Sequence, residues 1–103
     1  MSLVEIAKLH EIPEDGCLPY EGQEKILLWR SGDEVFATQF HCTHEALSLE
    51  DSWLNDDCTI ECPWHSAVFN LRDGAAVSAP ASKPLKVYPV QIVNESVLIN
   101  WDG

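Results

Sequence analysis

Two short motifs, each holding one cysteine and one histidine, place the strongest constraint on this chain of 103 residues. The first motif is Cys42-Thr43-His44 and the second is Cys62-Pro63-Trp64-His65, with seventeen residues between them. Each motif offers one thiolate and one imidazole, and two such loops facing each other offer a Cys₂His₂ set to a metal centre. The fold must therefore bring two separate segments to one place.

The mixture of donors within each motif narrows the kind of metal centre. Zinc accepts a Cys₂His₂ set, but zinc sites usually group like ligands together. Here each motif holds one ligand of each kind, and only Thr43 separates Cys42 from His44. That arrangement suits two adjacent irons better than one tetrahedral ion, and two cysteines on one iron with two histidines on the other is the Rieske [2Fe–2S] pattern. A zinc-stabilised binding module remains the alternative.

Outside the motifs, short apolar runs broken by turn residues are typical of a β protein. The longer strand-like runs are 4–7, 25–30, 34–39, 85–92 and 96–101, and shorter ones are 58–61 and 66–69. Ser31-Gly32-Asp33 predicts a hairpin, and Pro89 indicates an edge position or a bulge. Only the segment 45–55 has room for a short helical turn.

These patterns predict a single all-β domain over residues 1–103. We expect an antiparallel β-sandwich scaffold built from residues 1–40 and 81–103. A loop-rich cluster-binding subdomain, residues 41–80, is expected as an insertion in that scaffold. The tryptophans outside the motifs, Trp29, Trp53 and Trp101, are most simply packing residues of the core or its edges.

The charge balance limits the partners. Six Lys and Arg stand against seventeen Asp and Glu, a net charge of −11. Proteins that bind nucleic acid through phosphates need a basic face, so we expect no nucleic-acid partner. Six of the acids lie between the motifs, where no Lys or Arg occurs, and together they are able to steer basic partner surfaces. Taken singly, each acid reads more simply as part of a solvated loop.

No apolar stretch approaches the roughly 20 residues of a membrane span, and the start shows no secretory pattern. We therefore expect a cytoplasmic protein with no membrane partner. Thiols stay reduced in the cytoplasm, so Cys17 and Cys58, which have no ligand partner at useful spacing, read as buried or idle thiols.

The ligand pattern C-x-H-x₁₇-C-x₂-H resembles that of Rieske-type ferredoxins. Phe69-Asn70-Leu71-Arg72-Asp73-Gly74 resembles the strand and turn after the second motif in that family. Ala79-Pro80 resembles the proline loop over the cluster, and 85–90 resembles the closing strand. The resemblance implies the Rieske β-sandwich fold and one [2Fe–2S] cluster per chain. Its implied ligands are Cys42, His44, Cys62 and His65.

Departures from the quinol-oxidising Rieske proteins narrow the resemblance. Those proteins carry an extra disulfide-bonded cysteine in each loop, where this chain has Leu47 and Trp64. They also place a Ser and a Tyr after the second motif, whose hydroxyls raise the potential, where this chain has Ala67 and Phe69. The pattern is similar to the small ferredoxins of ring-hydroxylating dioxygenases. One oddity is Ser66, where the family commonly has Gly.

This resemblance implies an electron-transfer component of an aromatic-ring dioxygenase system, not an enzyme. An NAD(P)H-dependent ferredoxin reductase is expected to supply single electrons, and a terminal oxygenase to receive them. A monomer is expected. One rival is the small Rieske-like subunit of a nitrite reductase, although such subunits often lack the ligands. A complete oxygenase is excluded, because only His10 and His41 remain for a second iron site.

Overall fold

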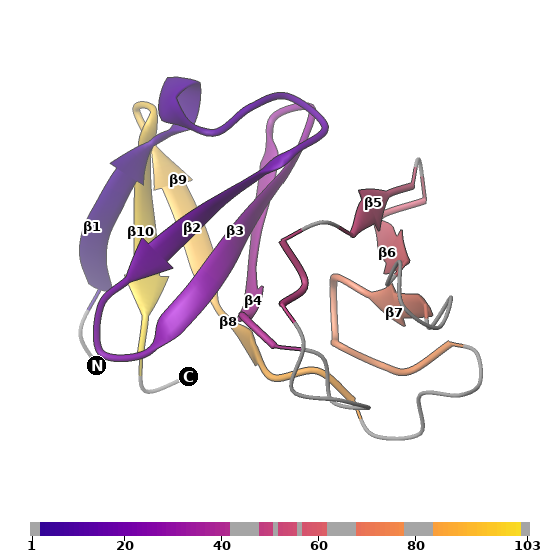
Figure 1. Cartoon of the computed structure of the whole chain (residues 1–103). Coiled ribbons are helices and arrows are strands. Elements are labelled where there is room, and N and C mark those ends of the chain that lie inside the picture. Colours follow the sequence, from indigo (N-terminus) through magenta and orange to yellow (C-terminus); the bar gives the residue numbers. More distant parts are fainter. Residues whose placement is uncertain are drawn as a thin grey trace.

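The computed structural model describes residues 3–41, 48–50, 52–55, 57–61, 68–77 and 84–101. Figure 1 shows their order along the chain. The elements are β1 (Leu3–Lys8), the 3₁₀ helix η1 (Leu9–Glu11), β2 (Cys17–Glu21), β3 (Lys25–Ser31), β4 (Glu34–Gln39), β5 (Trp53–Leu54), β6 (Thr59–Glu61), β7 (Val68–Asn70), β8 (Val87–Tyr88), β9 (Val90–Val93) and β10 (Ser96–Asn100). Within this described part, no helix is both long and apolar enough to span a membrane.

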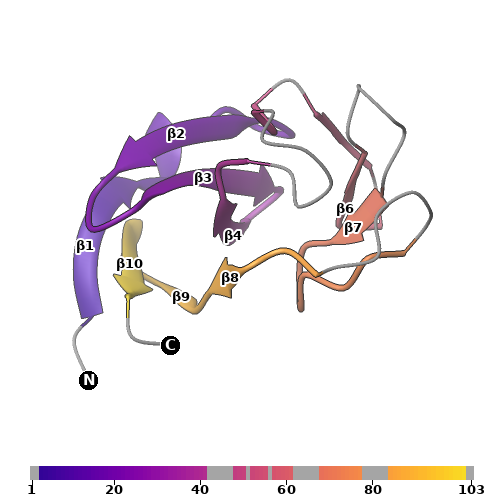
Figure 2. The ribbon, with the colours of Figure 1, turned by 60° about the horizontal axis from the view of Figure 1, so that its bottom comes forward.

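The strands form three antiparallel sheets, which confirms the predicted fold class. One sheet has the order β1-β10-β9 and a second has the order β2-β3-β4-β8. These two sheets pack face to face as a sandwich (Figure 2). The third sheet, β5-β6-β7, is smaller and is set to one side of the sandwich (Figure 1). The boundaries proposed for the inserted subdomain, 41 and 80, stay a prediction.

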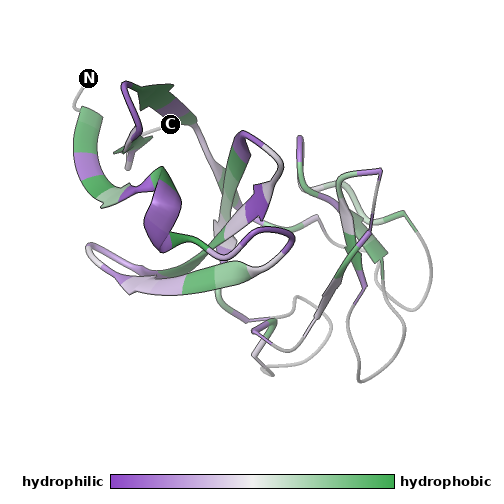
Figure 3. Cartoon of the chain, turned by 90° about the horizontal axis from the view of Figure 1, so that it is seen from above, coloured by the Kyte–Doolittle hydropathy of each residue, from purple (hydrophilic) through white to green (hydrophobic). Residues whose placement is uncertain are grey.

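Strand β3 is covered on both faces, which explains its unbroken apolar run. Ile26, Leu27, Leu28 and Trp29 are all 0–1% exposed. Successive side chains of a strand point to opposite faces, so the four residues supply two cores. Ile26 and Leu28 join the sandwich core against β1 and β10. Leu27 and Trp29 join a second core with the small sheet. Other scaffold strands carry hydrophobic and hydrophilic bands (Figure 3).

The hairpin predicted around Ser31-Gly32-Asp33 is confirmed by the pairing of β3 with β4. The strand predicted over 85–92 is divided at Pro89. Before it, β8 pairs with β4, and after it, β9 pairs with β10 in the other sheet. Proline has no N–H to give to a ladder, which suits the point where the chain changes sheets.

Two strands were not predicted from the sequence. Among the described residues of 45–55, Trp53 and Leu54 pair with β6 as strand β5, and none of these described residues is helical. Strand β2 contains Pro19, and among the described strands its one partner is β3. It is thus an edge strand, a position that tolerates proline.

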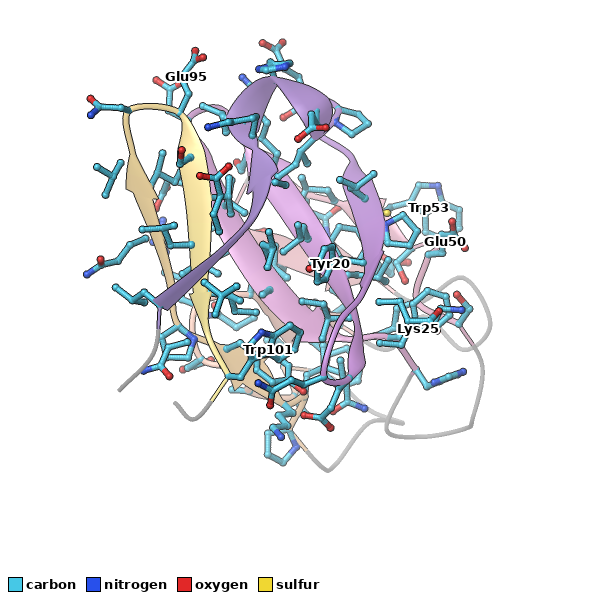
Figure 4. All side chains as sticks on the ribbon, turned by 90° about the vertical axis from the view of Figure 1, so that its left-hand side faces the viewer. Tyr20, Lys25, Glu50, Trp53, Glu95 and Trp101 are labelled. Atoms are coloured by element: carbon cyan, nitrogen blue, oxygen red, sulfur yellow. The ribbon has the colours of Figure 1, made fainter. Side chains whose placement is uncertain are left out.

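The tryptophans differ in their surroundings. Trp29 is buried, and its Nε1 donates to Thr38 Oγ1 at 3.0 Å. Trp101 stacks on Tyr20 at 6.3 Å between ring centroids and meets Tyr88 edge-on, near the end of β10 (Figure 4). These two are packing residues as predicted. Trp53 is 57% exposed, so the packing interpretation was wrong for it.

Candidate metal centre

The predicted ligands Cys42, His44, Cys62 and His65 all lie outside the described residues. What the structure describes is the frame from which their segments leave and to which they return. Three segments matter: 42–47 and 62–67, which hold the ligand motifs, and 78–83, which holds the predicted proline loop. Pro63, Trp64, Ser66 and Ala67 are likewise outside the described part, as are Leu47 and Ala79-Pro80.

The two ends of segment 42–47 are held together by backbone pairing. His41 and Ser48 form an antiparallel bridge, and the Leu49 N–H donates to the Phe40 carbonyl at 2.8 Å. Phe40 and Leu49 are buried, at 7% and 0% exposed. The chain therefore leaves toward Cys42 and returns at Ser48 from one fixed point beside β4.

The ends of segment 62–67 are the last pair of a strand ladder. Glu61 of β6 lies opposite Val68 of β7, and the next pair inward is Ile60 with Phe69. Both Ile60 and Phe69 are fully buried, which anchors the ladder. Because Glu61 directly precedes Cys62, the second motif starts from a fixed position.

Segment 78–83 is tied to the same small sheet. The Val77 N–H donates to the Val68 carbonyl at 2.7 Å, so Val77 continues the ladder past β7. On the return, the Leu85 N–H donates to the Gly74 carbonyl at 2.7 Å. The predicted proline loop therefore begins beside the strand that follows the second motif.

Gln39 links two of these segments and was not singled out from the sequence. Its backbone N–H donates to the Lys86 carbonyl at 2.9 Å, and its side-chain Oε1 accepts from the Lys86 N–H at 2.7 Å. Its Nε2 donates to the His41 carbonyl at 2.6 Å. One side chain thus fixes the residue before Cys42 relative to the chain that follows segment 78–83. A glutamine at a strand end gives no sequence signal for such a role.

One apolar core includes residues near the ends of all three segments. Its buried members come from β3, β6, β7 and the loops: Leu27, Trp29, Phe40, Leu49, Ile60, Phe69, Leu71 and Leu85. Phe40 and Leu49 flank the first segment in sequence, and Ile60 and Phe69 flank the second. The segments are held as a group because the side chains at their ends share this core.

The donor set of the two framed segments fits a Rieske cluster. The segments carry two thiols and two imidazoles, one of each in each motif. Replacing two of four thiolates by neutral imidazoles suits a [2Fe–2S] pair with unlike irons. Within the described residues, no group of three or more His, Cys, Asp or Glu side chains gathers to offer a competing metal site.

The other two cysteines have ordinary surroundings. Cys58 is buried, and its Sγ lies 3.5 Å from Nη2 of Arg72. Cys17 is half-buried, and its Sγ donates to the Glu50 carbonyl at 3.5 Å. For Cys58 this confirms the predicted buried thiol. The Cys17 contact ties β2 to the loop before β5.

Most described cations are compensated locally by carboxylates. Arg72 binds Glu34 with two hydrogen bonds of 3.0 and 3.1 Å, which holds the pKa of that carboxyl below its usual range. Glu24 accepts from Tyr88 Oη at 2.6 Å and from Lys86 Nζ at 3.0 Å, and these bonds lower its pKa. Further pairs join Lys8 to Glu5 and Arg30 to Glu14. Glu50, Asp57 and Glu61, the described acids between the motifs, take part in none of these pairs.

A cavity of about 650 Å³ lies elsewhere, between β4 and the β8–β9 segment. Its lining includes Phe36, Tyr88 and the Glu34–Arg72 ion pair. Leu71 is the one member of the core described above that lines it. None of the residues that directly precede or follow the three segments lines it.

Comparison with known proteins identifies the family. Residues 2–89 match the family described as Rieske [2Fe–2S] domain. The 3-phenylpropionate/cinnamic acid dioxygenase ferredoxin subunit of Photorhabdus laumondii is 36% identical over 96% of this chain and 94% of its own length.

Solved structures agree with this result. The ferredoxin of carbazole 1,9a-dioxygenase from Nocardioides aromaticivorans has a TM-score of 0.88 and 25% identity, over 96% of this chain and 97% of its own. A ferredoxin in a complex of reduced oxygenase and oxidized ferredoxin of carbazole 1,9a-dioxygenase has a TM-score of 0.82 and 28% identity, over 94% and 91%. A nitrite reductase small subunit, 18% identical, shares the fold alone. The chain belongs to the Rieske [2Fe–2S] family, as a ferredoxin component of dioxygenase type with a Rieske [2Fe–2S] cluster.

Proposed function

We propose that this protein carries single electrons from an NAD(P)H-dependent ferredoxin reductase to the terminal oxygenase of an aromatic-ring dioxygenase. The observation that supports it most is the frame itself. Two segments, each with one thiol and one imidazole, start and end at paired backbone positions over one buried core. Such a frame suits a site that changes charge without changing shape.

We assign the four ligands by the chemistry of their donors. Cys42 and Cys62 are proposed to hold one iron, and His44 and His65 the other. When bound, a Rieske cluster supplies one-electron redox chemistry at a potential above that of all-cysteine clusters. The chain's part is to fix the two pairs of donors through the ends of their segments. Gln39 and the Glu61–Val68 pair contribute to that positioning.

The reductase and the oxygenase substrate are inferred from what the similar proteins are named for. The relatives' names point to dioxygenases of aromatic acids and carbazole, so an aromatic substrate for the oxygenase is proposed here too. A supply of electrons from NAD(P)H implies that both encounters take place in the cytoplasm. Each encounter is expected to be brief and to bury little surface.

Spectroscopy of the purified protein tests the ligand assignment. The reduced protein is expected to give the electron paramagnetic resonance spectrum of mixed Cys/His ligation, and His44→Cys to change it sharply. His41→Cys is the matched control, because His41 neighbours Cys42 but is not a proposed ligand. A colourless protein with one zinc ion contradicts the assignment.

Reconstitution tests the function. The protein is mixed with the reductase and oxygenase of 3-phenylpropionate/cinnamic acid dioxygenase, and separately with those of carbazole 1,9a-dioxygenase. NADH-dependent product formation is expected to require this chain with at least one pair. Rates that are the same with and without it contradict the proposal.

A further inference from the structure

Four side chains form a row across the small sheet, fixed by the strand register. Trp53 of β5 lies opposite Glu61 of β6, and Glu61 lies opposite Val68 of β7. Val77 continues the row, because its N–H donates to the Val68 carbonyl at 2.7 Å. We call these four residues the outer row. Adjacent strands lie about 4.8 Å apart, so the outer row spans roughly 14 Å.

The outer row faces away from the core. The neighbouring row consists of Leu54, Ile60, Phe69 and Ala76, and all of these belong to or pack against the core shared with Phe40 and Leu49. Side chains alternate between the two faces of a sheet, so the outer row points the other way. Trp53 and Val77 are 57% and 58% exposed. A tryptophan and a valine so open to water form an apolar strip with one carboxylate in it.

The outer row also borders the proposed metal centre. Glu61 directly precedes Cys62, and Val68 directly follows segment 62–67. Val77 directly precedes segment 78–83. Three of the four residues are thus the last described positions before or after segments that the cluster proposal uses. A protein seated on the outer row therefore contacts the residues that directly precede and follow, in sequence, the segment carrying Cys62 and His65.

The chemistry of the strip selects a basic, arginine-bearing surface. An exposed indole face attracts a guanidinium, and a carboxylate such as Glu61 pairs with it in two-pronged geometry. Glu50, also exposed, lies in the same part of the molecule as Trp53 (Figure 4). Arg30, Arg72 and Lys86 pair with other carboxylates, and Lys25 lies over the Phe40 ring, with its Nζ 4.1 Å from the ring centroid. Glu61 and Glu50 place negative charge near the apolar anchor Trp53.

We propose that the outer row is the seat of the terminal oxygenase, with Trp53 as its main anchor. This inference rests on the proposed function. Steering by charge raises the encounter rate, whereas the binding energy of even a small interface is concentrated in a few desolvated anchors, for which Trp and Arg are favoured residues. The oxygenase is chosen over the reductase because a similar ferredoxin is found in a solved complex with an oxygenase.

Trp53→Ala tests the anchor. The measurement is the dissociation constant of the complex with whichever oxygenase turns over in the reconstitution. We expect the dissociation constant to rise by about tenfold or more. The same rise is expected near 1 M salt, where the Debye length is about 3 Å and charge interactions are screened, because the anchor is apolar. Glu61→Gln is expected to weaken binding at low salt only. In Trp53→Ala, the rate of reduction by the reductase is expected to stay within about twofold of wild type.

A matched pair of valines controls for general loss of apolar surface. Val77→Ser, in the outer row, is expected to weaken binding, whereas Val93→Ser, 49% exposed on β9 of the scaffold, is expected to leave it unchanged. The visible and paramagnetic resonance spectra of each variant verify that the cluster is intact.

Two results would overturn the inference. One is wild-type affinity for the oxygenase in Trp53→Ala, and the other is an equal or larger effect on the reductase. If the wild-type chain holds its cluster but none of the tested oxygenases turns over with it, the proposed function is overturned instead. The two failures are distinguished by whether the wild type, rather than only the variants, is inactive.

Discussion

Gly74 occupies a position that a side chain cannot share. Its φ is +78°, in the region that favours glycine, and a Cβ built on it overlaps the Leu85 carbonyl oxygen. The same residue donates from its N–H to the Asn70 carbonyl at 2.7 Å and accepts from the Leu85 N–H at 2.7 Å. Gly74 therefore fixes the turn after β7 against the chain that returns from segment 78–83. We predict that Gly74→Ala destabilises both.

Gly32 provides the scale for this prediction. Its φ is +62°, but nothing lies within 4 Å of the Cβ position, so Gly32→Ala carries the backbone strain without the overlap. That strain costs about 1–2 kcal/mol, and the lost freedom of the unfolded chain offsets about 0.4–1 kcal/mol of it. Overlap in a packed region adds about 1–3 kcal/mol. We expect a loss of about 1 kcal/mol in Gly32→Ala and about 2–4 kcal/mol in Gly74→Ala.

Thermal denaturation of the two cluster-loaded variants, at one scan rate, measures the difference. For a domain of this size, 1 kcal/mol shifts the midpoint by about 4–8 °C, so Gly74→Ala is expected to melt about 8 °C or more below wild type. The visible absorbance of the cluster should also fade faster than in Gly32→Ala. Equal midpoints in the two variants would refute the reasoning, because they would leave the overlap with Leu85 without cost.

Three further predictions concern the potential, the charge and the pH response. The midpoint potential is expected near the low end of about −150 to +300 mV, because Phe69 is fully buried in an apolar core and has no hydroxyl to donate; protein-film voltammetry measures it, and a value near the top contradicts the prediction. Raising ionic strength is expected to slow reduction by the reductase if the acids around the motifs steer the encounter, and a stopped-flow rate that is flat in salt excludes steering. Tyr88→Phe is expected to weaken the pH dependence of stability, because the Tyr88 and Lys86 bonds lower the pKa of Glu24. A lowered carboxyl pKa stabilises the fold above the unfolded value, about 4.3, and this is lost as pH falls through the folded pKa; melting midpoints from pH 3 to 7 that fall identically in both proteins contradict this.

Strand periodicity predicted most of the scaffold. The runs at 25–30 and 34–39 became β3 and β4, since two β-rich runs joined by a Gly-containing turn specify a hairpin locally. The division at Pro89 was not predictable in detail, because it depends on which sheet accepts each half. Strand β5 was missed for a similar reason: two residues form a strand only through pairing with β6.

The ligand motifs were recognisable because chemistry demands particular residues at particular spacings. Their supports were not. Gln39 acts through contacts with Lys86, which lies 47 positions away, and no local pattern reveals such a contact. The exposure of Trp53 likewise follows from its register against Glu61, and composition favoured the opposite interpretation.

Strand β3 is shared by two hydrophobic cores. Leu27 and Trp29 belong to the core with the small sheet, and Ile26 and Leu28 belong to the core of the sandwich. A substitution that perturbs the packing of one core therefore also affects the other, and the part of the molecule next to the ligand motifs does not unfold separately from the scaffold. Few substitutions in β3 affect one core alone, and thermal unfolding of this small domain is expected to be one cooperative transition.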